Sequence, residues 1–382
     1  MKTVIAIDSF KGSLSSVELS RHITIGIKNV YPDAHIISLP IADGGEGTVE
    51  ALVLGTGGKV VECVVNDPLM RPLKAKYGIL GNGKTAVIEM AEASGLTLLG
   101  EKERDPLKTT TYGTGELIKD ALSRGCREFI VGIGGSATND LGMGMMKAFG
   151  VSFKDENGDE LPGTGGSMEK VARIDTTNIL SELKECRFTI ACDVDNPLYG
   201  KHGAAYVYSR QKGADEKTIK QLDKGLRKLS DIIRKELGKD VAGIPGAGAA
   251  GGLGGAFVAF VDGELRSGID IVLKALDFEK KAEDADVVIT GEGRIDGQSV
   301  MGKAPTGVSK ICKEKGIPVI AFAGSLADDA TAVHAHGITS LFSIMNYPMQ
   351  LEEAMNPETA SKLIRKNTEE VFRLIKAFRD RR

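Results

Sequence analysis

The sequence has no excess of charge of either sign and little cysteine, and each of these shortages excludes a class of protein. Its 382 residues include 49 lysines and arginines and 52 aspartates and glutamates, which give a formal net charge of -3. This balance, without long runs of one sign, predicts no binding to nucleic acid. The five cysteines are widely spaced and form no CxxC pair, so we expect neither a disulfide framework nor a structural zinc site. A reducing cytoplasm is the expected location.

Long hydrophobic runs are also lacking. The apolar residues 4–7 are followed at once by Asp8, which leaves too short a core for a signal peptide. Residues 241–261 carry no charge, but Pro245 and repeated glycines make them a poor transmembrane helix. The sequence therefore predicts a soluble protein without a membrane partner.

The length of the chain predicts two domains, because a single hydrophobic core rarely grows past about 250 to 300 residues. Alternating strand and helix patterns occur only near the two ends of the chain. The expected strands are residues 3–8, 35–41, 287–290, 319–323 and 340–344, and the expected helices are residues 16–30, 305–315 and 357–378. Two strands from the N-terminal part and three from the C-terminal part predict one parallel, doubly wound α/β sheet in the order 2-1-3-4-5.

The middle of the chain has a different pattern. Residues 60–65, 74–80 and 85–91 are rich in β-forming residues and are joined by tight glycine turns, which predicts a mixed sheet. We therefore expect a discontinuous α/β domain of residues 1–58 and 281–382, interrupted by an inserted mixed α/β domain of residues 59–280. The cleft between two such domains is the natural place for a site.

Two glycine motifs match nucleotide-binding patterns in the wrong context. Residues 78–85 (GILGNGKT) satisfy the P-loop pattern, but the β-patterned residues around the glycines predict a hairpin rather than the helix that a P-loop opens. Residues 246–251 (GAGAAG) match the dinucleotide fingerprint, but Pro245 precedes them in place of a strand. These glycines allow either a ligand or a packed helix to approach the backbone closely.

The residues after the strand-like segment 129–133 suit an anion and a divalent metal. Gly134, Gly135 and Ser136 offer consecutive backbone donors to an anion. The neighbouring Asn139 and Asp140 carry oxygen atoms of the kind that bind Mg2+. The alternative for these residues is an Asx turn combined with a helix cap.

Other strand ends carry further acids and cations. The acids are Asp43, Glu46, Asp193, Glu292 and Asp296, accompanied by the amide of Asn196, and the cations are Lys11, Arg294 and Lys303. Carboxylates suit metal binding or proton removal, and cations suit neutralisation of a transferred phosphate. Turn formation, helix capping or simple solvation explains each residue taken alone. Because segments from both ends of the chain carry this combination, it predicts phosphoryl transfer.

The sequence resembles the type I glycerate kinase family in segments that cover nearly the entire chain. In chain order these segments are DSFKGSLSS, ADGGEGT, GIGGSATND, CDVDNPL, YSRQKGA, PGAGAAGGLGG, SGID and ITGEGRIDGQSVMGKAP. The resemblance implies an ATP-dependent kinase that acts on D-glycerate with Mg2+, and a flavodoxin-like domain interrupted by a second α/β domain. Leu141 departs from the pattern, which more often has glycine at this position.

The residue patterns and the resemblance together lead to one hypothesis for each site residue. Catalytic roles are assigned to Lys11, Asp193, Asp296 and Lys303, and substrate binding is assigned to Arg71, Ser136, Asn196 and Arg294. ATP binding is assigned to Gly134, Gly135, Thr138, Gly248 and Gly251, and metal binding to Asp43, Glu46, Asn139, Asp140 and Glu292. In this scheme Asp193 accepts the substrate proton or holds metal, and Arg71 clamps the glycerate carboxylate.

We expect ATP, Mg2+ and glycerate to meet between the two domains, with transfer to the 2-hydroxyl preferred. Three alternatives stay open: transfer to the 3-hydroxyl, a non-catalytic sensor of a phosphorylated metabolite, and a nicotinamide enzyme that uses residues 246–251. The sequence is compatible with a homo-oligomer.

Replacing Lys84 with Ala should leave the KM for ATP within about twofold of the wild-type value, because a lysine in a hairpin turn holds no phosphate. Steady-state kinetics at varied ATP concentration measures this. A large rise in that KM would restore the P-loop interpretation of residues 78–85.

Overall fold

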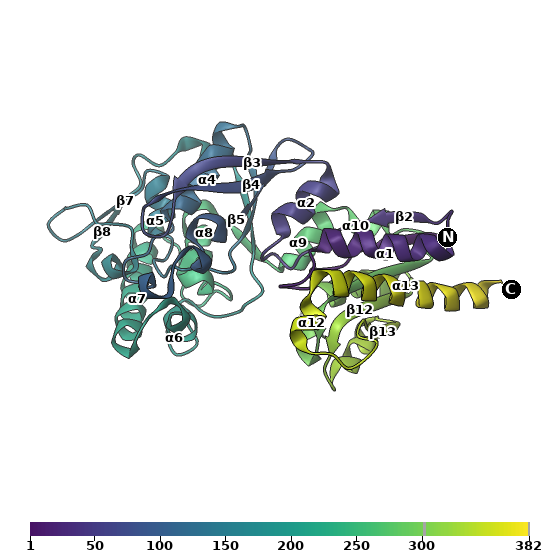
Figure 1. Ribbon diagram of the computed structural model, residues 1–382. Coiled ribbons are helices and arrows are strands. Elements are labelled where there is room, and N and C mark those ends of the chain that lie inside the picture. The colour runs from purple at the N-terminus through teal and green to yellow at the C-terminus, as the bar shows by residue number, and fades with distance from the viewer. Residues whose placement is uncertain (301–302, 381–382) are drawn as a thin grey trace. The chain divides into compact units, whose positions relative to one another are not determined.

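The computed structural model describes residues 1–300 and 303–380, and the chain forms two compact units (Figure 1). Unit 1 comprises Met1–Asp43, Glu50–Thr56 and Ile269–Arg382, and unit 2 comprises Gly44–Val49 and Gly57–Gly268. The structure therefore places residues 269–280 with unit 1, whereas the sequence interpretation assigned them to the inserted domain. The domain assignment itself stays a prediction. Residues 301–302, which belong to the motif at residues 287–305, lie outside the described residues.

Unit 1 contains one parallel sheet. Its strands are β1 (Lys2–Ile5), β2 (His35–Ser38), β11 (Val287–Ile295), β12 (Val319–Leu326) and β13 (Ser340–Ser343). They lie in the order β13-β12-β11-β1-β2, and every neighbouring pair is parallel. This arrangement confirms the predicted doubly wound order 2-1-3-4-5 and the α/β fold class.

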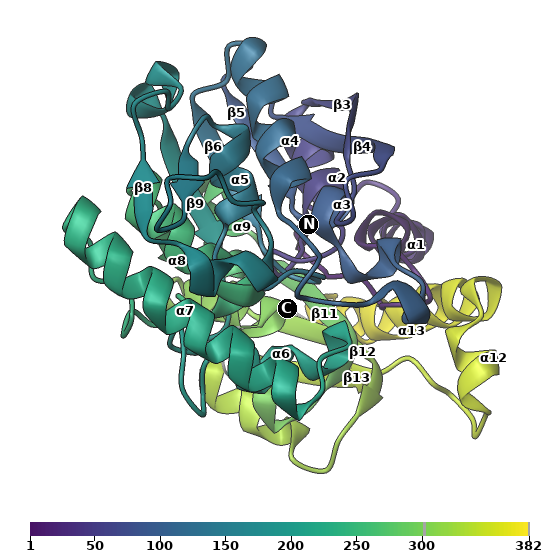
Figure 2. The same cartoon turned by 90° about the vertical axis from the view of Figure 1, so that its left-hand side faces the viewer.

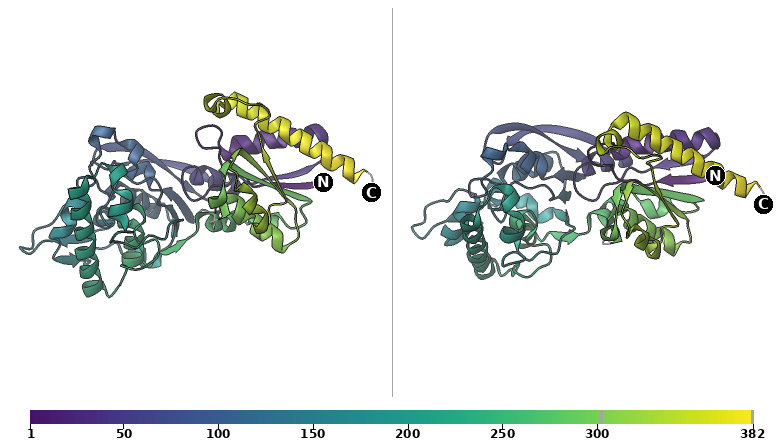
Figure 3. Two further views of the ribbon diagram at one scale, coloured as in Figure 1. Left: turned by 90° about the horizontal axis from the view of Figure 1, so that it is seen from below. Right: turned by 60° about the horizontal axis from the view of Figure 1, so that its bottom comes forward.

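The two long helices of unit 1 pack on each other although they come from opposite ends of the chain. Helix α1 (Ser16–Val30) begins with a capping box between Ser15 and Glu18, and α13 (Pro357–Arg379) begins at the cap Asn356. They approach so closely that a Cβ atom on Gly26 would lie 2.8 Å from the carbonyl oxygen of Arg365. Figure 3 shows α1 in purple beside α13 in yellow. The remaining helices that lie wholly or partly in this unit are α2 (Thr48–Thr56), α9 (Gly268–Ala275), α10 (Phe278–Lys281), α11 (Ala304–Glu314) and α12 (Leu351–Met355).

Strand β11 is longer than the sequence predicted. The expected strand ended at Thr290 and led into a glycine loop, but the observed strand continues to Ile295. Its extension pairs with β12, with Glu292 opposite Ala323 and Arg294 opposite Ser325. Glycine lowers intrinsic strand propensity, so the cross-strand pairing with β12 is what keeps this segment extended. Glu292 and Arg294 consequently lie on a strand and not on a loop.

Unit 2 is built around a mixed sheet, as predicted. Its strands are β3 (Lys59–Asn66), β4 (Pro72–Ile79), β5 (Thr85–Glu89), β6 (Glu128–Gly132), β9 (Arg187–Ala191) and β10 (Glu264–Arg266), in the order β10-β9-β6-β5-β4-β3. Strand β4 is antiparallel to both of its neighbours, β3 and β5, and the other neighbouring pairs of the sheet are parallel. The turn between β4 and β5 confirms the hairpin. Asn82 Oδ1 accepts hydrogen bonds from the backbone N–H groups of Lys84 and Thr85, and strand β5 begins at Thr85, where a P-loop would lead into a helix.

The helices of unit 2 surround this sheet, and the long α7 (Glu216–Leu237) crosses one side of the unit (Figure 2). The others are α3 (Ala91–Ser94), α4 (Tyr112–Ser123), α5 (Met143–Ala148), α6 (Ala204–Tyr208) and α8 (Ala249–Val261), and a small separate sheet pairs β7 (Ser152–Lys154) with β8 (Arg173–Asp175). The uncharged residues 241–261 thus include a largely buried helix, α8. Among the described residues, no helix combines the length and the hydropathy that a bilayer crossing requires.

Candidate functional site

Three acids of unit 1 lie at the carboxyl ends of neighbouring strands. Asp8 follows β1, Asp43 follows β2, and Glu292 lies in the second half of β11. The sheet order reverses between β1 and β11, and open α/β sheets bind ligands at such a point. We call Asp8, Asp43 and Glu292, together with Lys11, the carboxylate cluster.

The carboxylate cluster contains three acids but only one lysine. Lys11 Nζ lies 3.1 Å from Asp43 Oδ2. Burial and the nearby charge of Asp43 raise the pKa of Asp8 to about 7, although the Ser9 backbone N–H and Lys11 act in the opposite direction. Burial also raises the pKa of Glu292, despite the hydrogen bond of 2.6 Å that Ser299 Oγ donates to its carboxylate. One lysine therefore does not offset the repulsion among these acids.

The cluster meets a second group of charges on the same unit. Asp296 lies 3.7 Å from Lys303 Nζ and 3.8 Å from Arg294 Nε, and Lys303 stands at the N-cap of α11. The side chain of Arg294 is 69% exposed. All of these charged residues lie in unit 1, within the chain segments that the sequence interpretation assigned to the discontinuous domain: Lys11, Asp43, Glu292, Arg294, Asp296 and Lys303.

A divalent cation fits the charge of the carboxylate cluster. In the described part of the chain, no three His, Cys, Asp or Glu side chains are grouped closely enough to hold a metal ion between them. Mg2+ needs no such cage, because it binds through one or two carboxylates and takes its other ligands from water and substrate phosphates. Burial, and after it the charges of Asp43 and Glu292, raise the pKa of Asp8, and a cation bound beside these acids would stabilise their charged forms.

A second group of predicted site residues lies in unit 2, on the loop after β6. Residues 134–138, which we call the GGSAT loop, begin with the exposed Gly134 and Gly135 and continue into the buried Ser136 and Thr138. Leu96 N–H donates to Gly135 O at 2.8 Å and Ala137 N–H donates to Ser94 O at 2.9 Å. These two bonds fix the backbone of the loop against residues 94–96.

Asp140 is fully buried, and protein groups already satisfy its carboxylate. It accepts hydrogen bonds from the N–H and hydroxyl groups of Thr111, both at 2.8 Å, and from the N–H groups of Gly142 and Gly144. Burial raises the pKa of Asp140, and these four bonds oppose that shift. Asp140 therefore joins the loop to the starts of α4 and α5, as the turn-and-cap alternative anticipated, and its metal role stays an untested prediction.

Asp193 and Asn196 follow β9 and also have protein partners. Asp193 is exposed and accepts the backbone N–H of Gly268 at 2.9 Å. Asn196 donates to His202 O at 2.8 Å and accepts from the Tyr208 hydroxyl at 2.5 Å. Each residue thus has a local structural role beside the catalytic or substrate-binding role that the sequence suggested.

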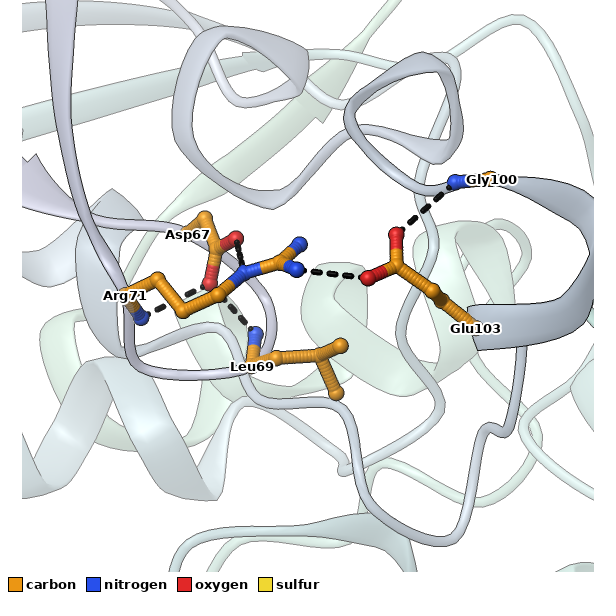
Figure 4. A network of polar contacts seen from close by, with 5 residues as sticks. All are labelled: Asp67, Leu69, Arg71, Gly100 and Glu103. Atoms are coloured by element: carbon orange, nitrogen blue, oxygen red, sulfur yellow. Dashed lines mark hydrogen bonds and ion pairs between the residues drawn. The ribbon is translucent and has the colours of Figure 1, made fainter.

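Arg71 is held by two acids of its own unit, as Figure 4 shows. Its Nε lies 2.5 Å from Asp67 Oδ2, and its Nη1 lies 2.6 Å from Glu103 Oε1. Glu103 is in turn fixed by the N–H of Gly100 at 3.0 Å. A guanidinium with two carboxylate partners is a poor clamp for a third, so this pairing competes with the predicted role.

The glycines of the GAGAAG run lie against other parts of the backbone. A Cβ atom on Gly251 would lie 2.2 Å from Thr138 O, and one on Gly248 would lie 2.3 Å from Pro197 O. Gly251 also has a φ of +70°, which favours glycine. Close packing, the alternative left open by the sequence, accounts for these two glycines. Glu46, in contrast, is exposed and belongs to unit 2, whereas Asp43 belongs to unit 1.

Two residues with strongly altered chemistry were absent from the sequence-based assignments. Asp8 was visible as the acid directly after an apolar strand. Lys212, in the segment YSRQKGA, is only 2% exposed, and its Nζ lies 2.7 Å from Ser136 Oγ and 2.6 Å from Thr138 O. Burial lowers the pKa of Lys212 to about 7, although the charge of Asp140 acts in the opposite direction. No sequence pattern marks a lysine as buried, so only the structure identifies it.

A doubly wound parallel sheet with charged groups at the carboxyl ends of its strands is typical of α/β enzymes that bind small anionic ligands. A model of the glycerate kinase family matches residues 3–376 of this chain. The glycerate 2-kinase of Escherichia coli strain K12 is 50% identical over 354 residues, which cover 93% of each chain. The glycerate kinase of Bacillus subtilis strain 168 is 48% identical over 376 residues, which cover 98% of each chain.

The fold agrees with a solved structure as well. A crystal structure of a protein from Salmonella typhimurium LT2 that has been assigned as a glycerate kinase 2 superposes with a TM-score of 0.91 at 45% sequence identity. The match covers 100% of this chain and 99% of that chain. The chain belongs to the glycerate kinase family, a family of phosphotransferases, which confirms the resemblance found in the sequence.

Removing the acid at position 8 should change how stability depends on pH when divalent cations are chelated. Because the pKa of Asp8 is about 7 in the folded state and near 3.8 when unfolded, the folded state binds more protons between these values. The free energy of unfolding of the wild type should therefore fall, relative to that of Asp8→Asn, by an amount on the order of 3 kcal/mol as the pH rises from about 4 to about 7.

Denaturant unfolding of both proteins across this pH range measures the difference, and Asp33→Asn, at an exposed position, serves as the control. Parallel pH profiles for the wild type and Asp8→Asn would show that Asp8 is not in a buried, charge-crowded site.

Proposed function

We propose that this protein is a glycerate kinase that transfers the terminal phosphoryl group of ATP to D-glycerate. The observation that carries the proposal is the carboxylate cluster at the strand ends of unit 1, in a chain that belongs to the glycerate kinase family. A phosphoryl transfer brings together several negative charges, and it depends on positioning and charge neutralisation more than on covalent chemistry. The residues of both units offer groups of this kind.

Lys11 and Lys303 are the cations that we assign to the transferred phosphoryl group. Lys11 is anchored by Asp43, and Lys303 is close to Asp296 at the start of α11, so both charges are directed by neighbouring acids. In unit 2, the backbone N–H groups at the start of the GGSAT loop are the donors that we assign to an anionic group of a substrate. That the two sets of groups act on one pair of substrates, in a cleft between the domains, stays a prediction from the sequence.

Mg2+ is part of the proposal, with one or two of the carboxylates of Asp8, Asp43 and Glu292 as the groups that would hold it. When bound, the ion would neutralise phosphate oxygens and orient them for in-line transfer. The residues of the chain have a separate task, since Lys11 must hold the ATP phosphates in one orientation while the acids hold the ion. We retain Glu46, Asn139 and Asp140 as further candidates, although Asp140 already accepts four hydrogen bonds from three residues of the protein.

We propose the 2-hydroxyl of glycerate as the acceptor, which is supported by the name glycerate 2-kinase of the Escherichia coli relative. We also propose a cytoplasmic location, since all five cysteines are free. A non-catalytic sensor is the second candidate, because the same anion-binding groups would hold a phosphorylated metabolite without turnover.

Incubating the purified protein with D-glycerate, ATP and MgCl2 should consume ATP and yield 2-phosphoglycerate. Phosphorus and proton NMR of the product identifies the phosphorylated hydroxyl directly. A product phosphorylated at the 3-hydroxyl would correct the position, and tight binding of phosphoglycerate without ATP consumption would favour the sensor.

The role of Asp193 can be separated from its contact with Gly268. Asparagine retains an oxygen that accepts the Gly268 N–H but lacks a carboxylate that accepts a proton or binds metal. If Asp193 is a base or a metal ligand, Asp193→Asn should lower kcat by about 100-fold or more with little change in thermal stability.

Asp193→Ala is the matched variant, since it removes both the contact and the carboxylate. Near-normal turnover of Asp193→Asn combined with a lower melting temperature of Asp193→Ala would assign Asp193 to capping and remove it from the mechanism.

A further inference from the structure

Lys212 is a buried lysine whose amino group hydrogen-bonds only to neutral groups, although the charge of Asp140 also acts on it. It lies at the end of a short 3-10 turn, Arg210–Lys212, and its side chain reaches Ser136 Oγ and Thr138 O. Within the described residues, no carboxylate lies within ion-pair distance of its Nζ. Burying an ammonium group is unfavourable unless an anion or several acceptors compensate it. Two neutral acceptors offset only part of this cost, so the position is suited to a nearby external anion.

The contact with Lys212 determines the direction of the Ser136 hydroxyl. In its protonated form Lys212 can only donate hydrogen bonds, so Ser136 Oγ is then the acceptor of the 2.7 Å bond. The hydroxyl proton of Ser136 then remains available to a different acceptor. Lys212 therefore converts Ser136 into a hydrogen-bond donor for a ligand.

Backbone donors lie directly beside this hydroxyl. Among the described residues, the N–H groups of Gly134, Gly135 and Ser136 find no protein acceptor, whereas the N–H of Ala137 donates to Ser94 O. Gly134 and Gly135 are exposed, so an anion can reach these N–H groups. Successive unpaired N–H groups in a loop of this kind form a concave donor set that binds anions.

The donor set is held in place by buried contacts of the residues that follow Ser136. Thr109 Oγ1 donates to Ala137 O at 3.1 Å, and Asn139 Nδ2 donates to Ser209 Oγ at 2.7 Å. Ser209 and Lys212 belong to the same turn, because the N–H of Lys212 donates to Ser209 O. One turn thus fixes the loop through Lys212 and the adjoining Asn139 through Ser209, and a preorganised donor set loses little entropy when it binds an anion.

We propose that Lys212 is a positioning residue of an oxyanion site, in which the Ser136 hydroxyl and the N–H groups of residues 134–136 bind a carboxylate or phosphate oxygen. The buried ammonium group orients the Ser136 hydroxyl so that its proton is directed to this oxyanion. The inference deepens the proposed function and rests on it for the source of the oxyanion, which is either the carboxylate of glycerate or a phosphate of ATP.

Steady-state kinetics of Lys212→Met, Ser136→Ala and the double variant test the proposal in the full-length protein, with ATP and glycerate varied separately. Each single variant should raise the KM for one ligand by about 10- to 100-fold, as expected for a lost hydrogen bond to a charged group. A raised glycerate KM identifies the carboxylate as the ligand, and a raised ATP KM identifies the phosphate. The double variant should be no worse than Lys212→Met, because Lys212 acts through Ser136.

Tyr77→Phe is the matched control. It removes a buried hydrogen bond of the same unit, the 2.7 Å bond from the Tyr77 hydroxyl to Asp120, without touching the GGSAT loop, so it should lower thermal stability but leave both KM values within about threefold of wild type. Changes of less than about twofold for Ser136→Ala, or fully additive effects in the double variant, would overturn the proposal.

Two further outcomes also decide the question. If Lys212→Met does not fold, Ser136→Ala alone must still raise one KM, and an unchanged KM overturns the proposal. If the wild type does not phosphorylate glycerate, the proposed function fails separately, and calorimetric titration with inorganic phosphate and with D-glycerate then compares the wild type with Ser136→Ala. Equal affinities of both proteins for both probes would again overturn the oxyanion site.

Discussion

The burial of ionisable side chains beside strand ends and loops is the constraint on which the proposed chemistry of this protein depends. In unit 1, Asp8 keeps a pKa of about 7 because burial and Asp43 disfavour its charged form. In unit 2, burial lowers the pKa of Lys212, whose hydrogen-bond partners are neutral acceptors. Each unit thus contains an ionisable group whose charged form burial disfavours, an acid in one case and a lysine in the other. Under the proposed function, a cation and an oxyanion are the ligands that would stabilise these charged forms.

Close backbone contacts and hydrogen bonds fix the GGSAT loop, which Lys212 contacts. Gly251 lies against Thr138 and leaves no room for a side chain, while Asp140 connects the same loop to α4 and α5 through four hydrogen bonds. The glycine run at residues 246–251 and the acid at position 140 therefore both contribute to fixing the backbone in and next to the GGSAT loop. Both features resembled ligand-binding groups in the sequence, and in the structure both have packing or hydrogen-bonding partners within the protein.

The same polar residue types serve in capping and in chemistry, which explains why the motifs alone did not separate the two roles. Arg71 was expected to clamp a carboxylate and also pairs with Asp67 and Glu103 of its own unit. Asp193 was expected to accept a proton and also receives the N–H of Gly268. A carboxylate or guanidinium shows its chemical type in the sequence, whereas its partners depend on which segments fold beside it.

The sequence alone determined the parallel order of unit 1, the mixed sheet of unit 2, the hairpin at residues 78–85 and the family, because hydrophobic periodicity, turn residues and motifs are local properties. Only the tertiary structure decided that β11 continues through Glu292, that Asp8 is crowded by other acids, and that Lys212 lies beneath Ser136. These facts depend on pairing with β12, on burial and on contacts between positions 136 and 212, and no local pattern encodes such long-range contacts.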